Sequence, residues 1–195
     1  MRKTRIIIIV VVCVALLVGG YSVWMNRNGN ASSENIELSK VQQLITKDLS
    51  KNYPETPREV VKLYNEIITC FYGEEYTEAE LEKLVDMTLL LMDEELAANN
   101  PREDYLKRVK AEIAAFDIVD RTIVSDTLES SNNVEYGKIY GEDSAIVQTS
   151  YFMKEKNSQN PYSKTFQNYL LRKDANGDWK ILGFEKVEGD TSNGK

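Results

Sequence analysis

The sequence predicts an α+β fold, in which an N-terminal transmembrane helix precedes about four helices packed on an antiparallel sheet. Three observations support this prediction. A long apolar stretch lies near the N-terminus, apolar residues then recur at helical spacing to about residue 117, and the remainder is rich in Val, Ile, Thr and aromatic residues interrupted by turn signals. Because the helices precede an unbroken run of strands, the pattern favours α+β over α/β.

The predicted transmembrane helix covers residues 6–25, a stretch without any charged side chain. About 20 residues of helix span about 30 Å, the thickness of the hydrocarbon core of a bilayer. Arg2, Lys3 and Arg5 precede the stretch, and basic residues resist translocation. We therefore expect residues 1–5 to form a cytoplasmic stub, residues 6–25 to cross the cell membrane once, and the rest of the chain to lie outside the cytoplasm.

A cleaved signal peptide is the competing interpretation of this stretch. Its best cleavage sites, after Gly20 or Ser22, place Val18 or Gly20 where an Ala-x-Ala pattern requires Ala, and the apolar residues continue to Met25. A retained anchor is therefore favoured. Residues 26–37 are small and polar, which predicts a flexible tether, and residues 188–195 are expected to be frayed.

The first two helices are predicted at residues 38–51 and 57–73. Val41, Leu44 and Leu49 share one side of the first. The second begins after Thr56, which forms a capping box with Glu59 and is followed by Pro at the first helical position.

The third and fourth helices are predicted from Thr77 and Asn100. Thr77 starts another capping box, and its helix runs toward Leu96 with its second half buried on most sides. Asn100 is the expected cap of the fourth helix, which stops near Asp117. The expected inner face of the fourth helix consists of Tyr105, Leu106, Val109, Ile113 and Phe116.

Five strands are predicted after the last helix. They cover residues 118–129, 134–140, 144–154, 164–173 and 179–187. Turn residues at 130–133, 141–143, 157–161 and 175–178 connect them. The pair Asn176 and Gly177 is the strongest turn signal, because both residues tolerate the positive φ of a tight hairpin.

The order of these elements resembles a known fold. Helices followed by a meander that closes with the hairpin of Tyr169–Asp174 and Trp179–Phe184 resemble the nuclear-transport-factor-like (NTF2-like) cone fold, with its curved antiparallel sheet. The N-terminal MRKTRIIIIV, the segment NNPREDYL and the closing LLRKD and WKILG are similar to an uncharacterised family of membrane-anchored bacterial proteins. This resemblance implies an anchor and a cone-fold domain at residues 38–187 that faces outward. It implies no reaction, because the superfold hosts enzymes, transport factors and secretion-system subunits alike.

Composition excludes several classes of function. The chain contains no His, which excludes His-based acid–base chemistry and removes the commonest metal ligand. Its formal net charge is −7, so nucleic acid is not an expected partner. Cys13 lies in the apolar stretch and Cys70 in the second helix, so we expect no disulfide between them and a buried, apolar role for Cys70.

Few residues are candidates for catalysis. An isomerase-like pair would need a Tyr in a pocket and a desolvated carboxylate. The loosely plausible residues are Tyr64, Tyr72, Asp86, Asp117 and Asp120. None of them stands in a specific motif, so core rings and surface or capping carboxylates are the favoured interpretation.

A calcium loop is the remaining candidate site. Asp174, Asn176 and Asp178 occupy its first, third and fifth positions, but Trp179 stands where the loop requires Gly, and strands flank the segment. A hairpin turn is therefore favoured. The acidic runs between residues 74 and 95 are expected to be solvated helix faces. No catalytic, cofactor-binding or metal-binding residue is assigned, and no cofactor is expected.

The leading hypothesis for function is a membrane-anchored, extracytoplasmic, non-catalytic module that binds a protein or a small-molecule ligand. A well-capped domain on a tether, without a catalytic constellation, favours it. An assembly component of a secretion or conjugation-type envelope machine is an alternative with the same layout. A small-molecule isomerase or dehydratase-like enzyme is a further alternative, which a deep pocket with a buried carboxylate facing a Tyr hydroxyl would support.

Overall fold

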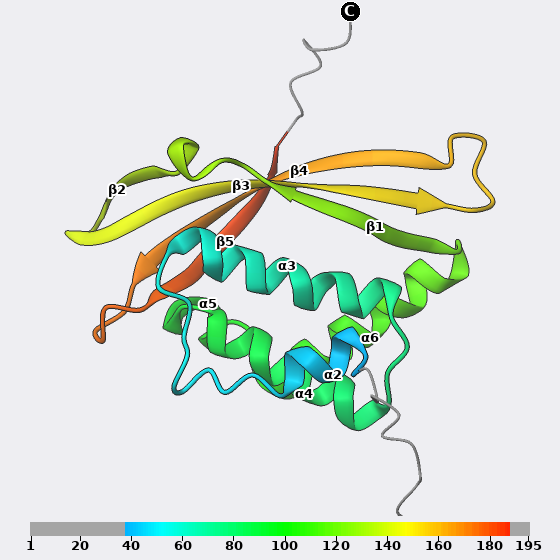
Figure 1. Cartoon of the computed structure of the whole chain (residues 1–195), viewed down its shortest axis with the longest axis horizontal. Helices are drawn as coiled ribbons and strands as arrows, with labels where there is room; N and C mark the ends of the chain where they lie inside the picture. The colour runs from blue at the N-terminus through cyan, green and yellow to red at the C-terminus, as the bar shows by residue number, and fades with distance from the viewer. Residues whose placement is uncertain (1–37, 188–195) are drawn as a thin grey trace, which may run out of the picture. The chain divides into compact units, whose positions relative to one another are not determined.

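A five-stranded antiparallel sheet with α-helices on one side makes up the computed structural model of the protein, which describes residues 38–187 (Figure 1). The predicted α+β class is therefore confirmed. The predicted stub, anchor and tether at residues 1–37 and the tail at 188–195 lie outside the described residues. Within residues 38–187, no helix has the length and apolar character needed to cross a bilayer.

The central helix, α3 (Pro57–Gly73), begins and ends where the sequence predicts. The Thr56 hydroxyl accepts a hydrogen bond from the backbone N–H of Glu59, and the Glu59 carboxylate accepts one from the backbone N–H of Thr56. This exchange satisfies two of the N–H groups that the start of a helix otherwise leaves free.

The third predicted helix is broken in two. α4 (Glu78–Leu91) starts with the predicted capping box of Thr77 but ends before Met92. Met92 is extended and bridges to Ile181 of the last strand, which takes its backbone out of the helix. The side chain of Asp93 then caps a separate short helix, α5 (Glu94–Ala98).

This break also changes the predicted burial. Leu96 lies in α5 rather than at the end of α4. Leu90, which was expected to be covered, is 56% exposed in the described structure. The prediction that the second half of this helix is buried on most sides is therefore wrong at Leu90.

The first helix, α2 (Lys40–Ile45), is shorter than the predicted 38–51. The hydroxyl of Thr46 donates to two carbonyls of the last turn, and a turn around Asp48 follows. Side-chain bonds of this kind compete with the helical ladder and end the helix early. Leu49 is nevertheless buried, as its place on the predicted apolar side requires.

The long helix α6 (Arg102–Ile118) follows the predicted course but not the predicted cap. Its cap position is Pro101, without a side-chain hydrogen bond, and the amide of Asn100 instead donates to the carbonyl of Leu96 at 2.6 Å. Of the predicted inner face, Val109 is fully covered and the other four side chains are half-buried.

All five predicted strands are present. The strands are β1 (Arg121–Leu128), β2 (Glu135–Ile139), β3 (Glu142–Glu155), β4 (Tyr162–Lys173) and β5 (Trp179–Val187). Their order is β1-β3-β4-β5, and β2 also pairs with β3. β1 and β2 share one edge of β3, at residues 149–155 and 142–146. β1 starts later than the predicted residue 118 because α6 continues through Ile118.

Two tight turns depend on positive φ angles. Tyr140 (φ 52°) and Gly141 (φ 91°) form a two-residue turn between β2 and β3, one residue earlier than predicted. Between β4 and β5, Gly177 has φ 87°, whereas Asn176 is not in the left-handed region that the sequence predicted for it. The carboxylate of Asp174 accepts the backbone N–H groups that close this turn.

Both outer edges of the sheet are interrupted. β1 has an irregular register against β3 between Ile123 and Ser125. At the opposite edge, the register of β4 and β5 shifts between Leu170 and Leu171, and Met92 pairs with the outer side of β5 at Ile181.

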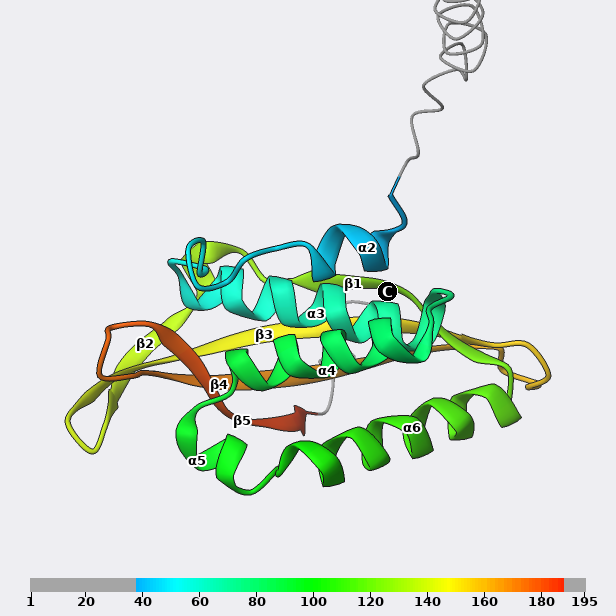
Figure 2. The same ribbon diagram turned by 90° about the horizontal axis from the view of Figure 1, so that it is seen from below.

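The hydrophobic core lies between α3, α4 and the sheet. Figure 2 shows α4 between α3 and α6 on the helical side. The largest fully buried apolar side chains are Ile67, Leu84, Leu91, Tyr169, Leu171 and Ile181. Since they come from α3, α4, β4 and β5, burial of this core fixes the position of α3 on the sheet.

Candidate functional site

The interface between α3 and the sheet is filled by a network of polar side chains. Asn65 is fully buried, and its Nδ2 donates to Asp126 Oδ2 at 3.0 Å and to Thr149 Oγ1 at 2.9 Å. Its Oδ1 accepts from the Tyr151 hydroxyl at 2.5 Å, and that hydroxyl lies 2.8 Å from the hydroxyl of Tyr169. The network links α3 to β1, β3 and β4.

Burial keeps the phenols of this network neutral. It raises the pKa of Tyr151 and Tyr169 above the ordinary value, because a phenolate in this interior would lose its hydration. Asp93 is the one buried carboxylate among residues 38–187, and both of its oxygens bind Arg172. The described residues therefore provide no buried carboxylate that faces a Tyr hydroxyl.

A cavity of about 220 Å³ lies beside this network, between α3, α6 and β5. Its apolar walls are formed by Ile68, Phe71, Met92, Leu96, Val109 and Phe184. Its polar lining consists of Tyr64, Tyr72, Asn100, Tyr105, Arg108 and Glu112. Tyr64 separates the cavity from the network, because its ring packs edge-on against that of Tyr169 with 5.3 Å between the centroids.

Two opposite charges on α6 are held apart at this cavity. Side chains one turn apart, such as Arg108 and Glu112, commonly pair on a helix. Here Arg108 Nη2 donates to Asn100 Oδ1, and Glu112 Oε2 accepts from the Tyr72 hydroxyl at 2.9 Å. The Tyr72 ring is fixed in turn by stacking on Phe116, with 4.1 Å between the centroids. In the described part of the chain, no ion pair joins the guanidinium to the carboxylate.

The buried hydroxyls of the lining are neutral. Burial raises the pKa of Tyr105 to about 12 and that of Tyr64 well above its ordinary value. The guanidinium of Arg108 lies over the Tyr105 ring, with its Cζ 5.9 Å from the centroid. The charge of the lining therefore comes from Arg108 and Glu112 alone, and it sums to zero.

The structure brings together two of the five residues that the sequence singled out. Tyr64 and Tyr72 both line the cavity. Asp117 borders a wider hollow at the other end of α6, and Asp120 pairs with Lys156 at 3.2 Å. The predicted pool of carboxylates does not reach the cavity.

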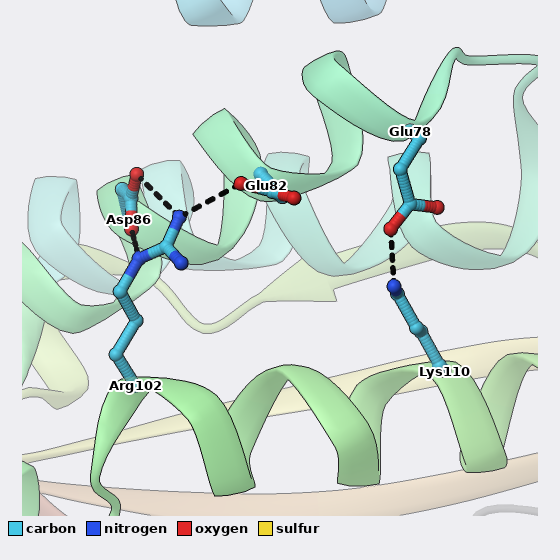
Figure 3. A network of polar contacts seen from close by, with 5 residues as sticks. All are labelled: Glu78, Glu82, Asp86, Arg102 and Lys110. Atoms are coloured by element: carbon cyan, nitrogen blue, oxygen red, sulfur yellow. Dashed lines mark hydrogen bonds and ion pairs between the residues drawn. The ribbon is translucent and has the colours of Figure 1, made fainter.

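The fifth candidate, Asp86, belongs to the surface contact between α4 and α6 (Figure 3). Arg102 Nε donates to Asp86 Oδ1 at 2.5 Å, and Arg102 Nη2 donates to Glu82 Oε2 at 3.3 Å. Lys110 pairs with Glu78 further along the same two helices. Acidic side chains that were expected to be solvated therefore form half-exposed ion pairs between α4 and α6.

The sequence did not single out Arg108 or Glu112, and it predicted Tyr105 only as part of the inner face of its helix. Tyr105, Arg108 and Glu112 lie on one side of α6, and their spacing of three and four residues is the signal that could have grouped them. At the β4–β5 turn, the Asp174 carboxylate is used by the backbone, in agreement with the predicted hairpin. Within residues 38–187 there is no group of three or more acidic or Cys side chains that could hold a metal.

Comparison with known proteins identifies a family but no activity. No curated protein matches the sequence. Among solved structures, the crystal structure of the intermembrane space region of the chloroplast protein ARC6 is similar at 12% identity and a TM-score of 0.36, covering 73% of this chain and 98% of that one. The profile of the family described as a domain of unknown function, DUF6715, matches residues 1–184. The chain therefore belongs to the DUF6715 family.

Proposed function

We propose that this DUF6715 protein is a non-catalytic binding module that one membrane-spanning segment displays outside the cytoplasm. The observation that carries the proposal is the cavity between α3, α6 and β5, whose cationic and anionic groups are each held by a neighbour and not by one another. Charges fixed in this way at a concave, largely apolar surface provide a ready site for a polar group of a small ligand.

The proposed setting rests on the N-terminal residues. The uncharged stretch at 6–25, behind three basic residues, supports a retained single-pass anchor with the lipid bilayer as its partner. For the domain at 38–187 we propose the NTF2-like cone fold. The helices on one side of the sheet and the closing β4–β5 hairpin support it.

A binding role is favoured over catalysis by the filled interface. The space between α3 and the sheet is occupied by Asn65 and its hydrogen-bonded partners, and the one buried carboxylate of the described residues is neutralised by Arg172. The cavity also favours a small molecule over a protein, because a concave site of this size accepts a side chain or a metabolite and not a folded surface.

The location is tested with the full chain in a bacterial host. We expect the protein to stay in the membrane pellet after alkaline carbonate extraction, and a phosphatase fused after Lys195 to be active, since that enzyme folds only outside the cytoplasm. A variant without residues 6–25 is the control and should be soluble. Extraction of the intact chain by carbonate, or an inactive fusion, would refute the proposed location.

Binding is tested on the full chain in detergent micelles with a pool of small metabolites. Native mass spectrometry is expected to find a bound molecule, and Leu96→Trp is expected to remove it by filling the cavity. Leu90→Trp is the matched control, because Leu90 is exposed and does not line the cavity. The predicted ligand is absent from Leu96→Trp and present in Leu90→Trp. If no bound molecule shows this difference, the cavity is not a binding site and the proposal fails.

A further inference from the structure

We propose that the cavity binds the zwitterion of one free apolar amino acid, an inference that rests on the proposed binding function. The guanidinium of Arg108 would receive the α-carboxylate, the carboxylate of Glu112 would receive the α-ammonium, and the side chain would enter the apolar part of the cavity.

The charges of the lining select the ligand class. The carboxylate of Glu112 repels a ligand that carries only negative charge, and the guanidinium of Arg108 repels a ligand that carries only positive charge. A zwitterion compensates both, and its two charged groups are joined by one carbon atom, which suits partners one helical turn apart. The remaining polar groups, the hydroxyls of Tyr64 and Tyr105, are neutral and add no third charge.

The positions of the two charged side chains are prepared in advance. Asn100 holds the guanidinium of Arg108 at one end, and the hydroxyl of Tyr72 holds the carboxylate of Glu112 at the other. Without these bonds the two side chains would be free to neutralise each other on α6. Because the two side chains are already held in place, they lose fewer rotamers when a ligand binds, and the entropic cost of binding is smaller.

Size and wall chemistry define the side chain of the ligand. Pockets for drug-sized molecules measure roughly 300–1,000 Å³, and this cavity of about 220 Å³ is smaller. This volume suits one amino acid. Ile68, Leu96 and Val109 line it with aliphatic carbon, so leucine, isoleucine and phenylalanine are better ligands than glycine or aspartate.

The test is isothermal titration calorimetry on the full chain in micelles, with leucine and two analogues that each lack one charge. N-acetylleucine lacks the ammonium and leucinamide lacks the carboxylate. We expect leucine to bind and each analogue to bind about 2- to 5-fold more weakly, because Arg108 and Glu112 are exposed and solvent screens each charged contact. Glycine is expected to be weak because it leaves the apolar walls exposed to water.

Two variants assign the charges. In Arg108→Gln, leucine and leucinamide should bind equally well, and in Glu112→Gln, leucine and N-acetylleucine should bind equally well. Lys107→Gln and Glu103→Gln are matched controls on the same helix outside the cavity and should bind leucine as the natural chain does. Thermal unfolding of each variant checks that it is folded.

Three results would overturn the inference: no binding of leucine, isoleucine or phenylalanine, equal binding of leucine and N-acetylleucine by the natural chain, or leucine binding that survives Leu96→Trp. If the metabolite pool yields a different ligand that Leu96→Trp removes, the amino-acid assignment fails while the proposed function stands. If Leu96→Trp removes no ligand at all, both fail.

Discussion

Replacing Asp93 by Asn tests the most deeply buried ion pair of the described domain. Asp93 is 3% exposed, and its Oδ1 and Oδ2 accept from Arg172 Nη2 at 2.7 Å and Nε at 3.1 Å. The side chain of Arg172 is 11% exposed. Asn has the same shape as Asp and also caps helices well, so it keeps the bond to the backbone N–H of Glu95. It removes the charge and places an NH2 donor where Oδ2 accepts from Arg172 Nε.

The expected loss in the free energy of unfolding depends on the carboxylates that remain around Arg172. Breaking a buried pair by removing one partner costs about 3–5 kcal/mol. The carboxylates of Glu95 and Glu142 each lie 3.2 Å from Arg172 and continue to compensate its charge. We therefore expect a loss of about 3 kcal/mol in the free energy of unfolding, which lowers the melting temperature of a chain of this size by about 6–12 °C.

The assay is thermal unfolding of the full chain in micelles, followed by near-ultraviolet circular dichroism. Asp86→Asn is the matched control, because its partner Arg102 is on the half-exposed α4–α6 surface, where ion pairs contribute little. The double variant Asp93→Asn, Arg172→Met should recover most of the loss, since no unpaired cation stays buried. Equal melting temperatures for Asp93→Asn and Asp86→Asn would refute the reasoning.

Turn geometry and polar packing give two further tests by thermal unfolding, and pH gives a third by ultraviolet absorbance. Tyr140→Asn should stabilise the protein by about 0.5–1 kcal/mol, because Tyr140 is 94% exposed at a positive φ that Asn adopts more easily; a lower melting temperature would contradict this. Asn65→Leu should cost about 2–3 kcal/mol, because it removes the buried amide that bonds Asp126, Thr149 and the Tyr151 hydroxyl, and an unchanged melting temperature would show that the network is dispensable. The pKa of Tyr105 is about 12 in the folded state against 10.0 for a free tyrosine, so its contribution to stability is complete below pH 10 and is lost as the pH rises toward 12. Ultraviolet absorbance should show the buried tyrosines, Tyr105 among them, ionising only together with loss of tertiary structure, and a folded protein with every tyrosine ionised near pH 10 would contradict this.

The parts of the fold that could be predicted from the sequence are those that local chemistry decides. The capping boxes at Thr56 and Thr77 each involve residues three positions apart, so the starts of α3 and α4 are correct. The end of α4 depends on a strand far along the chain, because Met92 leaves the helix to pair with Ile181. No periodicity in residues 78–96 contains that information.

The cavity lay beyond prediction for a related reason. The helical spacing of three and four residues places Tyr105, Arg108 and Glu112 on one side of α6. The same spacing is found in a helix packed tightly on the core. Whether a space remains depends on how far α6 lies from α3 and β5, which only the three-dimensional arrangement shows. The absence of His, by contrast, is evident from the composition and excludes His-based acid–base catalysis.

The interrupted edges of the sheet limit the pairing of strands between neighbouring molecules. An uncovered strand edge can add a strand from another molecule and so begin polymerisation. Here the irregular register between Ile123 and Ser125 distorts the edge strand β1. On the opposite edge, Met92 pairs with Ile181 of β5 and so occupies that position. Chains anchored in one membrane, as proposed, would meet at high local concentration. Such edges would let the domains stand densely side by side without joining into a continuous sheet.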